Sequence, residues 1–140
     1  MAKFESGMCA TGRMMKIWKK RLIDNCPRCG AANETSTHIL QCSSVDAKTT
    51  WEKSMQQLEE WMNTNSTCPH IKRLIIQTLN QWRKRERISG LKDFDFDGIE
   101  SVFASKQYIG WRQFLGVCVS MEWAKLQHSY LRLIWVRRAG

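Results

Sequence analysis

Apolar residues recur at helical spacing along most of the chain, and no segment shows the strict alternation of a half-buried strand. Trp51, Met55, Leu58 and Trp61–Met62 follow this helical period. Similar patterns place the expected helices at about residues 11–22, 36–42, 44–62, 69–87, 99–115 and 120–136. The pattern predicts an all-α fold of about five or six helices.

Polar residues, glycines and prolines separate these segments. Asp24–Asn33 contains Asn, Pro and Gly and is expected to be a loop. Thr35 or Ser36 can cap the short helix that follows, and Pro69 suits the first turn of another. Gly116 is expected to separate the last two helical regions.

The loop and the short helix contain a cluster of cysteines and histidine. Cys26, Cys29, His38 and Cys42 have the spacing C-x2-C-x8-H-x3-C. A C-x2-C turn directs two thiolates at one point, and His38 and Cys42 share a helix face. Three sulfurs and one imidazole form a closed ligand set typical of structural zinc. We therefore predict Zn²⁺ at these four residues.

Three other interpretations of the cluster compete with zinc. A disulfide is disfavoured because the chain starts without an apolar signal-peptide core and has no long apolar span, which predicts an intracellular protein of the nucleus or cytoplasm. A C-x-x-C redox pair normally follows a strand, and none is expected here. Chance clustering of buried cysteines does not explain the added histidine at helical spacing.

Basic residues gather in two runs. The net charge is +9, and residues 1–29 and 71–92 are strongly basic whereas residues 30–63 are net acidic. Basic faces of this kind suit polyanions such as nucleic acid, although solvated helix surfaces and helix C-termini also collect cations. The predicted phosphate contacts are Lys16, Lys19, Lys20, Arg21 and Arg28, together with Arg83, Lys84, Arg85 and Arg87.

Other candidate sites are weaker. Cys68 and His70 could form half of a second metal site, but no further ligands lie near them in sequence. Asp93, Asp95 and Asp97 match the opening of a calcium loop, yet Ala104 stands where a bidentate Glu would complete it. We found no phosphate-binding Gly-rich loop or nucleophile elbow, so no enzymatic activity is expected.

Three patches of the sequence resemble the region downstream of the polymerase in retrotransposon reverse-transcriptase polyproteins of the non-LTR type. They are ATGRMMKIWKKR, CPRCGAANETSTHILQC and IGWRQFLGVCVSMEWAKLQHSY. In the second patch the C-x2-C, the acidic-Thr pair Glu34–Thr35, and the final His and Cys follow the pattern of that family's zinc-binding module. The resemblance implies a transposable-element protein that binds zinc and nucleic acid, without the polymerase itself.

These observations predict two parts packed as one unit: residues 1–43 as a basic helix with a zinc-binding module, and residues 44–140 as a helical domain. The expected function is a zinc-stabilised nucleic-acid-binding module that contacts RNA or DNA mainly through phosphates. A protein partner, or other parts of a parent polyprotein, are further expected partners, and no membrane is expected. The alternative is a helical protein-interaction or self-association module whose zinc is purely structural.

Overall fold

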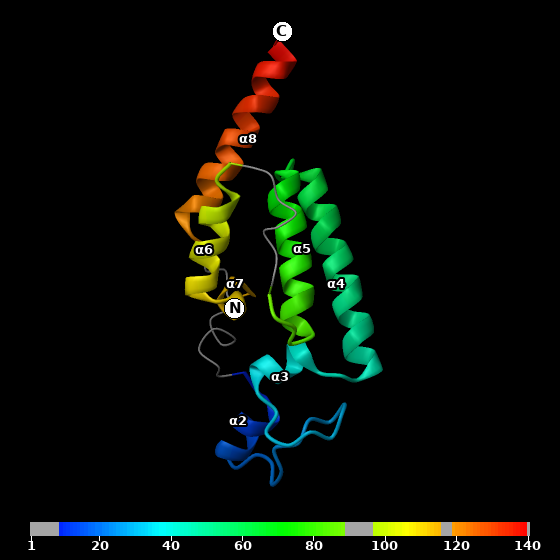
Figure 1. Ribbon diagram of the computed structural model, residues 1–140. Helices are drawn as coiled ribbons and strands as arrows, with labels where there is room; N and C mark the ends of the chain where they lie inside the picture. The colour runs from blue at the N-terminus through cyan, green and yellow to red at the C-terminus, as the bar shows by residue number, and fades with distance from the viewer. Residues whose placement is uncertain (1–8, 89–96, 116–118, 140) are drawn as a thin grey trace. The chain divides into compact units, whose positions relative to one another are not determined.

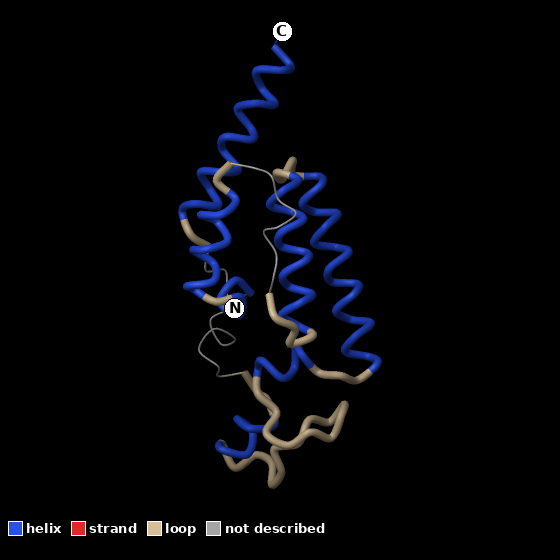
Figure 2. The backbone as a smooth tube through the Cα atoms, in the orientation of Figure 1, coloured by secondary structure: helices blue, strands red, loops and turns tan. Residues whose placement is uncertain are grey.

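The computed structural model describes residues 9–88, 97–115 and 119–139, and these residues form helices without any strand (Figures 1 and 2). The all-α prediction is confirmed. Seven helices are present in the described ranges. They are α2 (Gly12–Ile17), α3 (Ser36–Gln41), α4 (Val45–Thr64), α5 (Pro69–Arg83), α6 (Ile99–Ile109), α7 (Trp111–Leu115) and α8 (Met121–Ala139).

The chain divides into two compact units, Met1–Met55 and Gln56–Gly140, which we call unit 1 and unit 2. The boundary falls within α4, whereas the predicted division after residue 43 lies just before this helix begins. Unit 1 holds the cysteine–histidine cluster, and unit 2 holds α5 to α8.

Helix α2 of unit 1 is shorter than expected and ends at Ile17. Thr11 starts it by accepting the N–H of Met14 on its hydroxyl oxygen. At the other end Lys19 has φ of 56°, and the N–H groups of Lys19 and Lys20 donate to the carbonyls of Lys16 and Met15. This pair of hydrogen bonds defines a Schellman motif, which terminates the helix.

The core of unit 2 includes the predicted apolar face of α5 and an aromatic cluster. Ile71, Leu74, Ile75 and Leu79 are buried, as the helical period predicted. Trp111 of α7 and Trp123 of α8 are also buried, with ring centroids 6.5 Å apart. Phe114 lies 5.5 Å from Trp123, and the ammonium of Lys106 lies 4.8 Å from the Phe114 ring. These rings join α6, α7 and α8.

The region expected as one helix over 99–115 is broken at Gly110. Gly110 has φ of 92°, a conformation that L side chains rarely adopt, and it separates α6 from α7. The break lets Trp111 turn back toward Phe103, whose ring centroid is 6.4 Å away. Gly116, the expected separator, lies outside the described residues.

Gln127 ties α8 to the turn between α4 and α5. Its side-chain oxygen accepts the N–H of Cys68 at 2.8 Å, and its amide donates to the carbonyl of Ser66 at 3.0 Å. Cys68 is buried and precedes the first turn of α5, whose early N–H groups have no partner within the helix. One side chain therefore supplies both a donor and an acceptor to the backbone of this turn.

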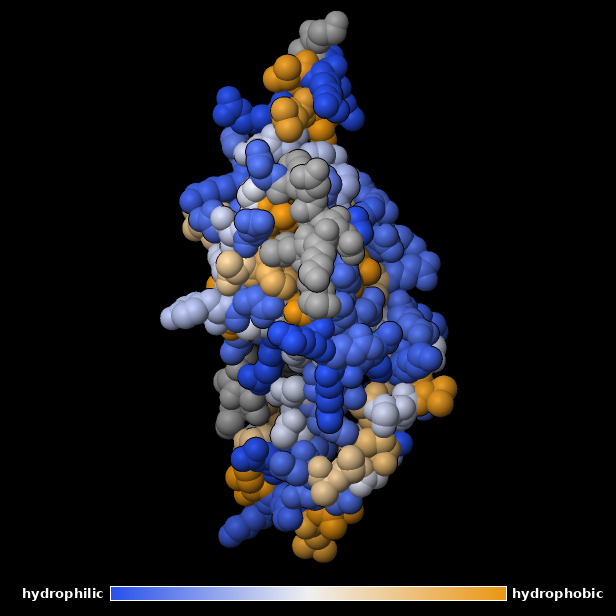
Figure 3. Space-filling view, viewed as in Figure 1, coloured by the Kyte–Doolittle hydropathy of each residue, from blue (hydrophilic) through white to orange (hydrophobic). Residues whose placement is uncertain are grey.

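Several large apolar side chains are exposed, including Trp61, one of the residues that recur at helical spacing. Trp61 of α4 is 62% exposed, and on α8 the exposed set includes Leu133, Trp135 and Val136. The space-filling view shows apolar and charged groups side by side along the C-terminal part of α8 (Figure 3). No helix in the described ranges has the length and apolar character needed to cross a membrane.

We expect Gln127→Ala to destabilise unit 2 by about 1–3 kcal/mol, because the buried N–H of Cys68 loses its acceptor. Urea unfolding followed by circular dichroism measures this change. Ser129→Ala is the matched control: its hydroxyl bonds only within α8, so the change should stay within about 0.5 kcal/mol. Equal stability of the two variants would contradict the role assigned to Gln127.

Candidate metal centre

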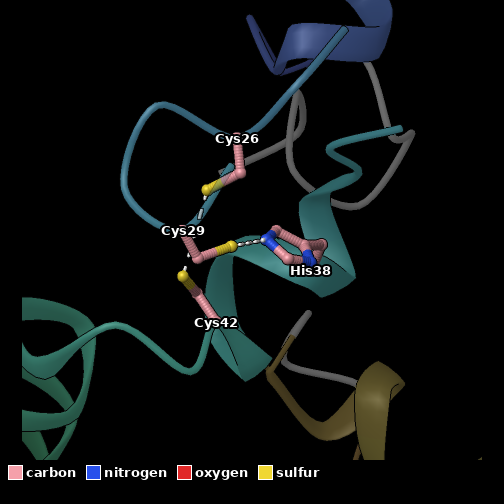
Figure 4. Close-up of side chains that lie close together, drawn as sticks. All are labelled: Cys26, Cys29, His38 and Cys42. Atoms are coloured by element: carbon pink, nitrogen blue, oxygen red, sulfur yellow. Dashed lines mark hydrogen bonds between the residues drawn. The ribbon is translucent and has the colours of Figure 1, made fainter. Parts of the chain in front are cut away.

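The four predicted ligands come together in unit 1. The three sulfur atoms and the imidazole nitrogen of Cys26, Cys29, His38 and Cys42 all lie within 4.8 Å of one another. Figure 4 shows these side chains pointing toward a common centre, two from the loop and two from α3 and its C-terminal end. The sulfurs of Cys26 and Cys42 are 3.9 Å apart, and Cys29 Sγ lies 3.3 Å from His38 Nε2. This group of residues can hold a metal ion.

The two loop cysteines are held in a tight turn. The N–H of Gly30 donates to the carbonyl of Cys26, and the N–H of Cys26 donates to the carbonyl of Ala31, both at 2.8 Å. Gly30 has φ of 76°, which its lack of a side chain permits. The side chain of Asn25 donates to the carbonyl of Gly30 at 2.9 Å. These bonds set the direction of both thiols.

The other two ligands depend on a capped short helix. Thr35 accepts the N–H of His38 on its hydroxyl oxygen at 3.1 Å, which starts α3 and orients His38. Cys42 follows the last helical residue, so its side chain lies one turn from His38. Ser44 then accepts the N–H of Ala47 and starts α4, with its hydroxyl 3.5 Å from Cys42 Sγ.

The protonation of the thiols differs within the cluster. Burial raises the pKa of Cys42, but hydrogen bonds from the side chain and backbone of Ser44 outweigh this and bring that pKa to about 7. The backbone of Ala31 lowers the pKa of Cys29, but burial and the neighbouring thiols raise it overall. Cys42 is therefore the thiol that ionises most readily, and thiolate is the form that binds metal.

A buried carboxylate joins the loop to the start of α2. Glu34 is 6% exposed, and its Oε2 atom accepts the N–H of Gly12 at 2.6 Å. Its backbone also accepts the N–H of Arg13 and donates to the carbonyl of Asp24. A negative charge at a helix N-terminus is favourable because the free N–H groups there carry partial positive charge. Glu34 thus fixes α2 on the loop that carries the cysteines.

A close backbone approach accompanies this bond. A Cβ atom at Gly12 would lie 2.5 Å from the carbonyl oxygen of Asp24, so only glycine fits. The carboxylate of Asp24 also pairs with Lys16 at 3.1 Å and accepts the N–H of Asn33. The hydrogen bond from Lys16, with the N–H of Asn33, holds the pKa of Asp24 below its usual value. Both ends of α2 are thereby linked to the loop.

The predicted phosphate contacts of unit 1 lie around the end of α2 and on the loop. Lys19 and Lys20 are exposed in the turn that ends α2, and Arg21 beside them is partly exposed. Lys16 forms the ion pair with Asp24 described above, and Arg28 donates to the carbonyl of Ile39 at 3.2 Å. Lys16 and Arg28 therefore also help to hold the fold.

The second basic run lies in unit 2, at the end of α5. Arg85 has φ of 59°, and the N–H groups of Arg85 and Glu86 donate to the carbonyls of Trp82 and Gln81. Lys84 and Arg87 are exposed, and Arg83 is partly exposed. This helix end is also a Schellman motif, and cations at a helix C-terminus are stabilising without any ligand.

Several residues that build the centre were not predicted from their own chemistry. Glu34 entered only through the family resemblance, and neither Gly12 nor Asp24 was singled out. Glu34 directly precedes the capping residue Thr35, and Gly12 directly follows the capping residue Thr11. Both positions are weak local signals. The bond between Glu34 and Gly12 crosses 22 positions of sequence, which no local pattern reveals.

Cys68 and His70, the other candidate within the described residues, gain no metal-site geometry. The cluster described above is the only potential metal-binding group of three or more His, Cys, Asp or Glu in the described part of the chain. Cys9, Cys26, Cys29, Cys42 and Cys68 are free thiols, so none forms the disulfide considered from the sequence. Asp93 and Asp95 of the candidate calcium loop lie outside the described residues.

Comparison with protein-family models, with curated proteins and with solved structures gives no match. The fold and the site define the chain as a small all-helical protein with a three-cysteine, one-histidine cluster that can hold a metal.

We expect Gly12→Ala to destabilise unit 1 by about 1–3 kcal/mol, because its methyl group would overlap the Asp24 carbonyl. Hydrogen exchange of the Arg13 amide, which donates to the Glu34 carbonyl, should accelerate as α2 detaches. Gly30→Asn is the control: a Cβ at Gly30 meets nothing within 4 Å, and Asn tolerates a positive φ. An unchanged exchange rate in Gly12→Ala would refute the close approach.

Proposed function

We propose that unit 1 is a zinc-stabilised nucleic-acid-binding module. The observation that carries this proposal is the convergence of Cys26, Cys29, His38 and Cys42, joined by Glu34 to a helix that ends in a basic turn. Zinc supplies the folding energy of the loop, and the loop orients Lys19 and Lys20 for contact with phosphates.

The donor distances favour zinc at the cluster. Zn–S bonds of about 2.3 Å and Zn–N bonds of about 2.0 Å in a tetrahedron separate two sulfurs by about 3.8 Å and a sulfur from a nitrogen by about 3.6 Å. One sulfur–sulfur separation here is 3.9 Å and one sulfur–nitrogen separation is 3.3 Å, and all four atoms lie within 4.8 Å of one another. Thiolate-rich sets with one imidazole prefer zinc to calcium or magnesium, which take oxygen ligands. All four positions are filled by protein, so the zinc is structural and activates no water.

The basic turn of unit 1 supports binding to a polyanion. Lys19 occupies the left-handed position of a Schellman motif, where glycine is the usual residue. A lysine there carries a backbone cost of about 1 kcal/mol. Its attraction to the helix C-terminus offsets part of this cost, and a phosphate contact gives a further reason for lysine. Residues 16–23 contain no acidic side chain, and Asp24, which follows them, already pairs with Lys16.

We also propose that the chain derives from a retrotransposon polyprotein. Two features that the resemblance picked out have structural roles here: Glu34 anchors α2, and Thr35 caps α3. Trp111, Ser120, Trp123 and Gln127 of the third patch likewise form core or bridging contacts. We propose no catalytic role for the chain.

A second candidate function is interaction with another protein. It is favoured by the exposed apolar side chains of α8, where Leu133, Trp135 and Val136 are each more than half exposed. In this alternative the zinc is purely architectural, and concentration-dependent association would replace binding to nucleic acid.

The zinc proposal predicts one zinc per purified chain by elemental analysis. Cys42→Ser should lose the metal and the ordered structure of unit 1, because Cys42 is buried at the centre of the cluster. His38→Cys should keep zinc, since four thiolates also form a structural site. Cys68→Ser is the control and should retain one zinc, because this buried thiol lies outside the cluster. Zinc loss in Cys68→Ser, or its retention in Cys42→Ser, would count against the site.

The nucleic-acid proposal predicts that the affinity for nucleic acid falls steeply with salt concentration. Lys19 and Lys20 of the basic turn should account for a measurable part of this dependence. Charge reversal of Lys19 and Lys20 to Glu should weaken binding at least about tenfold at low salt. It should also reduce the slope of log K against log salt by about 1.5, at about 0.7–0.9 per phosphate contact. Fluorescence anisotropy over a salt series gives both quantities.

Two control variants separate local contact from net charge and from folding. Reversal of Lys48 and Lys53, exposed on α4 in the same unit, changes the net charge equally and should have a smaller effect. Lys19→Gly relieves the positive φ, so it should preserve stability and zinc while still weakening binding. If both double reversals weakened binding equally, the basic turn would not be the contact surface.

A further inference from the structure

The end of α2 exposes an aromatic ring among cations. Trp18 is the C-cap residue of α2 and is 39% exposed. Ile17 is 58% exposed, Leu22 94% and Ile23 55%. Apolar groups also lie beside hydrophilic ones on the visible surface of unit 1 (Figure 3). Residues 17–23, which we call the α2 turn, thus combine exposed apolar side chains with Lys19 and Lys20.

The α2 turn is rigid enough to serve as a platform. The N–H of Trp18 donates to the carbonyl of Met14, and those of Lys19 and Lys20 donate to Lys16 and Met15. Just before the turn, the Lys16–Asp24 pair links α2 to the cysteine loop. These bonds fix the backbone from which the Trp18 side chain projects.

An exposed indole beside two lysines favours single-stranded over duplex nucleic acid. A duplex presents phosphates and base edges, because each base face is covered by its neighbours. A single strand also offers free base faces, which stack on aromatic side chains, while its phosphates contact nearby cations. Lys19 and Lys20 alone would suit either form, whereas an exposed indole beside them adds affinity only for unstacked bases.

We propose that the α2 turn binds single-stranded nucleic acid, with a base stacked on Trp18 and adjacent phosphates contacting Lys19 and Lys20. This inference rests on the proposed nucleic-acid-binding function and names its substrate class. Leu22 and Ile23 extend the apolar contact along the strand.

The test measures binding of the zinc-loaded full chain to a labelled single strand of about 12 nucleotides. The same strand is also presented as a duplex and with abasic sites in place of its bases. Trp18→Leu keeps an apolar side chain without a ring, and Trp18→Phe restores an aromatic face. Trp61→Leu is the matched control, because Trp61 is 62% exposed but lies beside Glu59 and Glu60.

We expect Trp18→Leu to weaken single-strand binding about tenfold, Trp18→Phe to recover most of it, and Trp61→Leu to change nothing. Abasic substitution should weaken the wild type by a similar factor and should add no further loss in Trp18→Leu. Duplex affinity should be the same in all variants. Zinc content and circular dichroism confirm that each variant is folded.

Two results would overturn the inference, and they can be told apart. If Trp18→Leu bound the intact single strand as tightly as the wild type, or lost equal affinity for duplex and abasic strand, stacking would be excluded while phosphate binding survived. If no form of nucleic acid bound at low salt, the proposed function itself would fail, and a protein partner would become the better explanation of the α2 turn.

Discussion

Four metal-binding groups confined within 4.8 Å are the constraint on which unit 1 depends. Thiolates brought this close repel one another, and the raised pKa of Cys29 beside a lowered one at Cys42 expresses that conflict. A bound cation removes the repulsion and turns the same arrangement into an attractive one. The loop around it contributes few apolar groups of its own, so a metal bound at the cluster would contribute directly to its folding.

The backbone carries this constraint from the centre to the surface. Glu34 lies between the two halves of the cluster in sequence. Its buried carboxylate accepts the N–H of Gly12 at the N-terminus of α2. Gly12 allows the helix to approach the carbonyl of Asp24, and Lys16 closes the second link. A basic turn that would otherwise sample many orientations is held relative to the centre. The nucleic-acid binding that we propose at this turn would therefore be coupled to metal occupancy without any contact between ligand and metal.

Features set by near neighbours in sequence were predictable. The helical period located most helices, and the spacing of Cys26, Cys29, His38 and Cys42 identified the cluster because each pair is joined by one turn. Contacts between distant segments were not predictable: Gln127 reaches Cys68 across 59 positions, and periodicity carries no information about such pairs. Periodicity also does not say what covers an apolar side chain, so the exposure of Trp18 could not be predicted from the sequence.

The α2 turn and the cysteine loop also determine how readily proteases cleave the chain. Lys19, Lys20, Arg21 and Arg28 are the residue types after which trypsin-like enzymes cut, and these enzymes need several residues in an extended form. In the folded unit the amides of Lys19 and Lys20 are bonded to α2 carbonyls. Cleavage must then wait for opening, whose frequency follows the stability of the unit. If the cluster binds zinc as we propose, a chain made when zinc is scarce would open and be cleaved sooner, so metal supply would regulate its abundance as well as its fold.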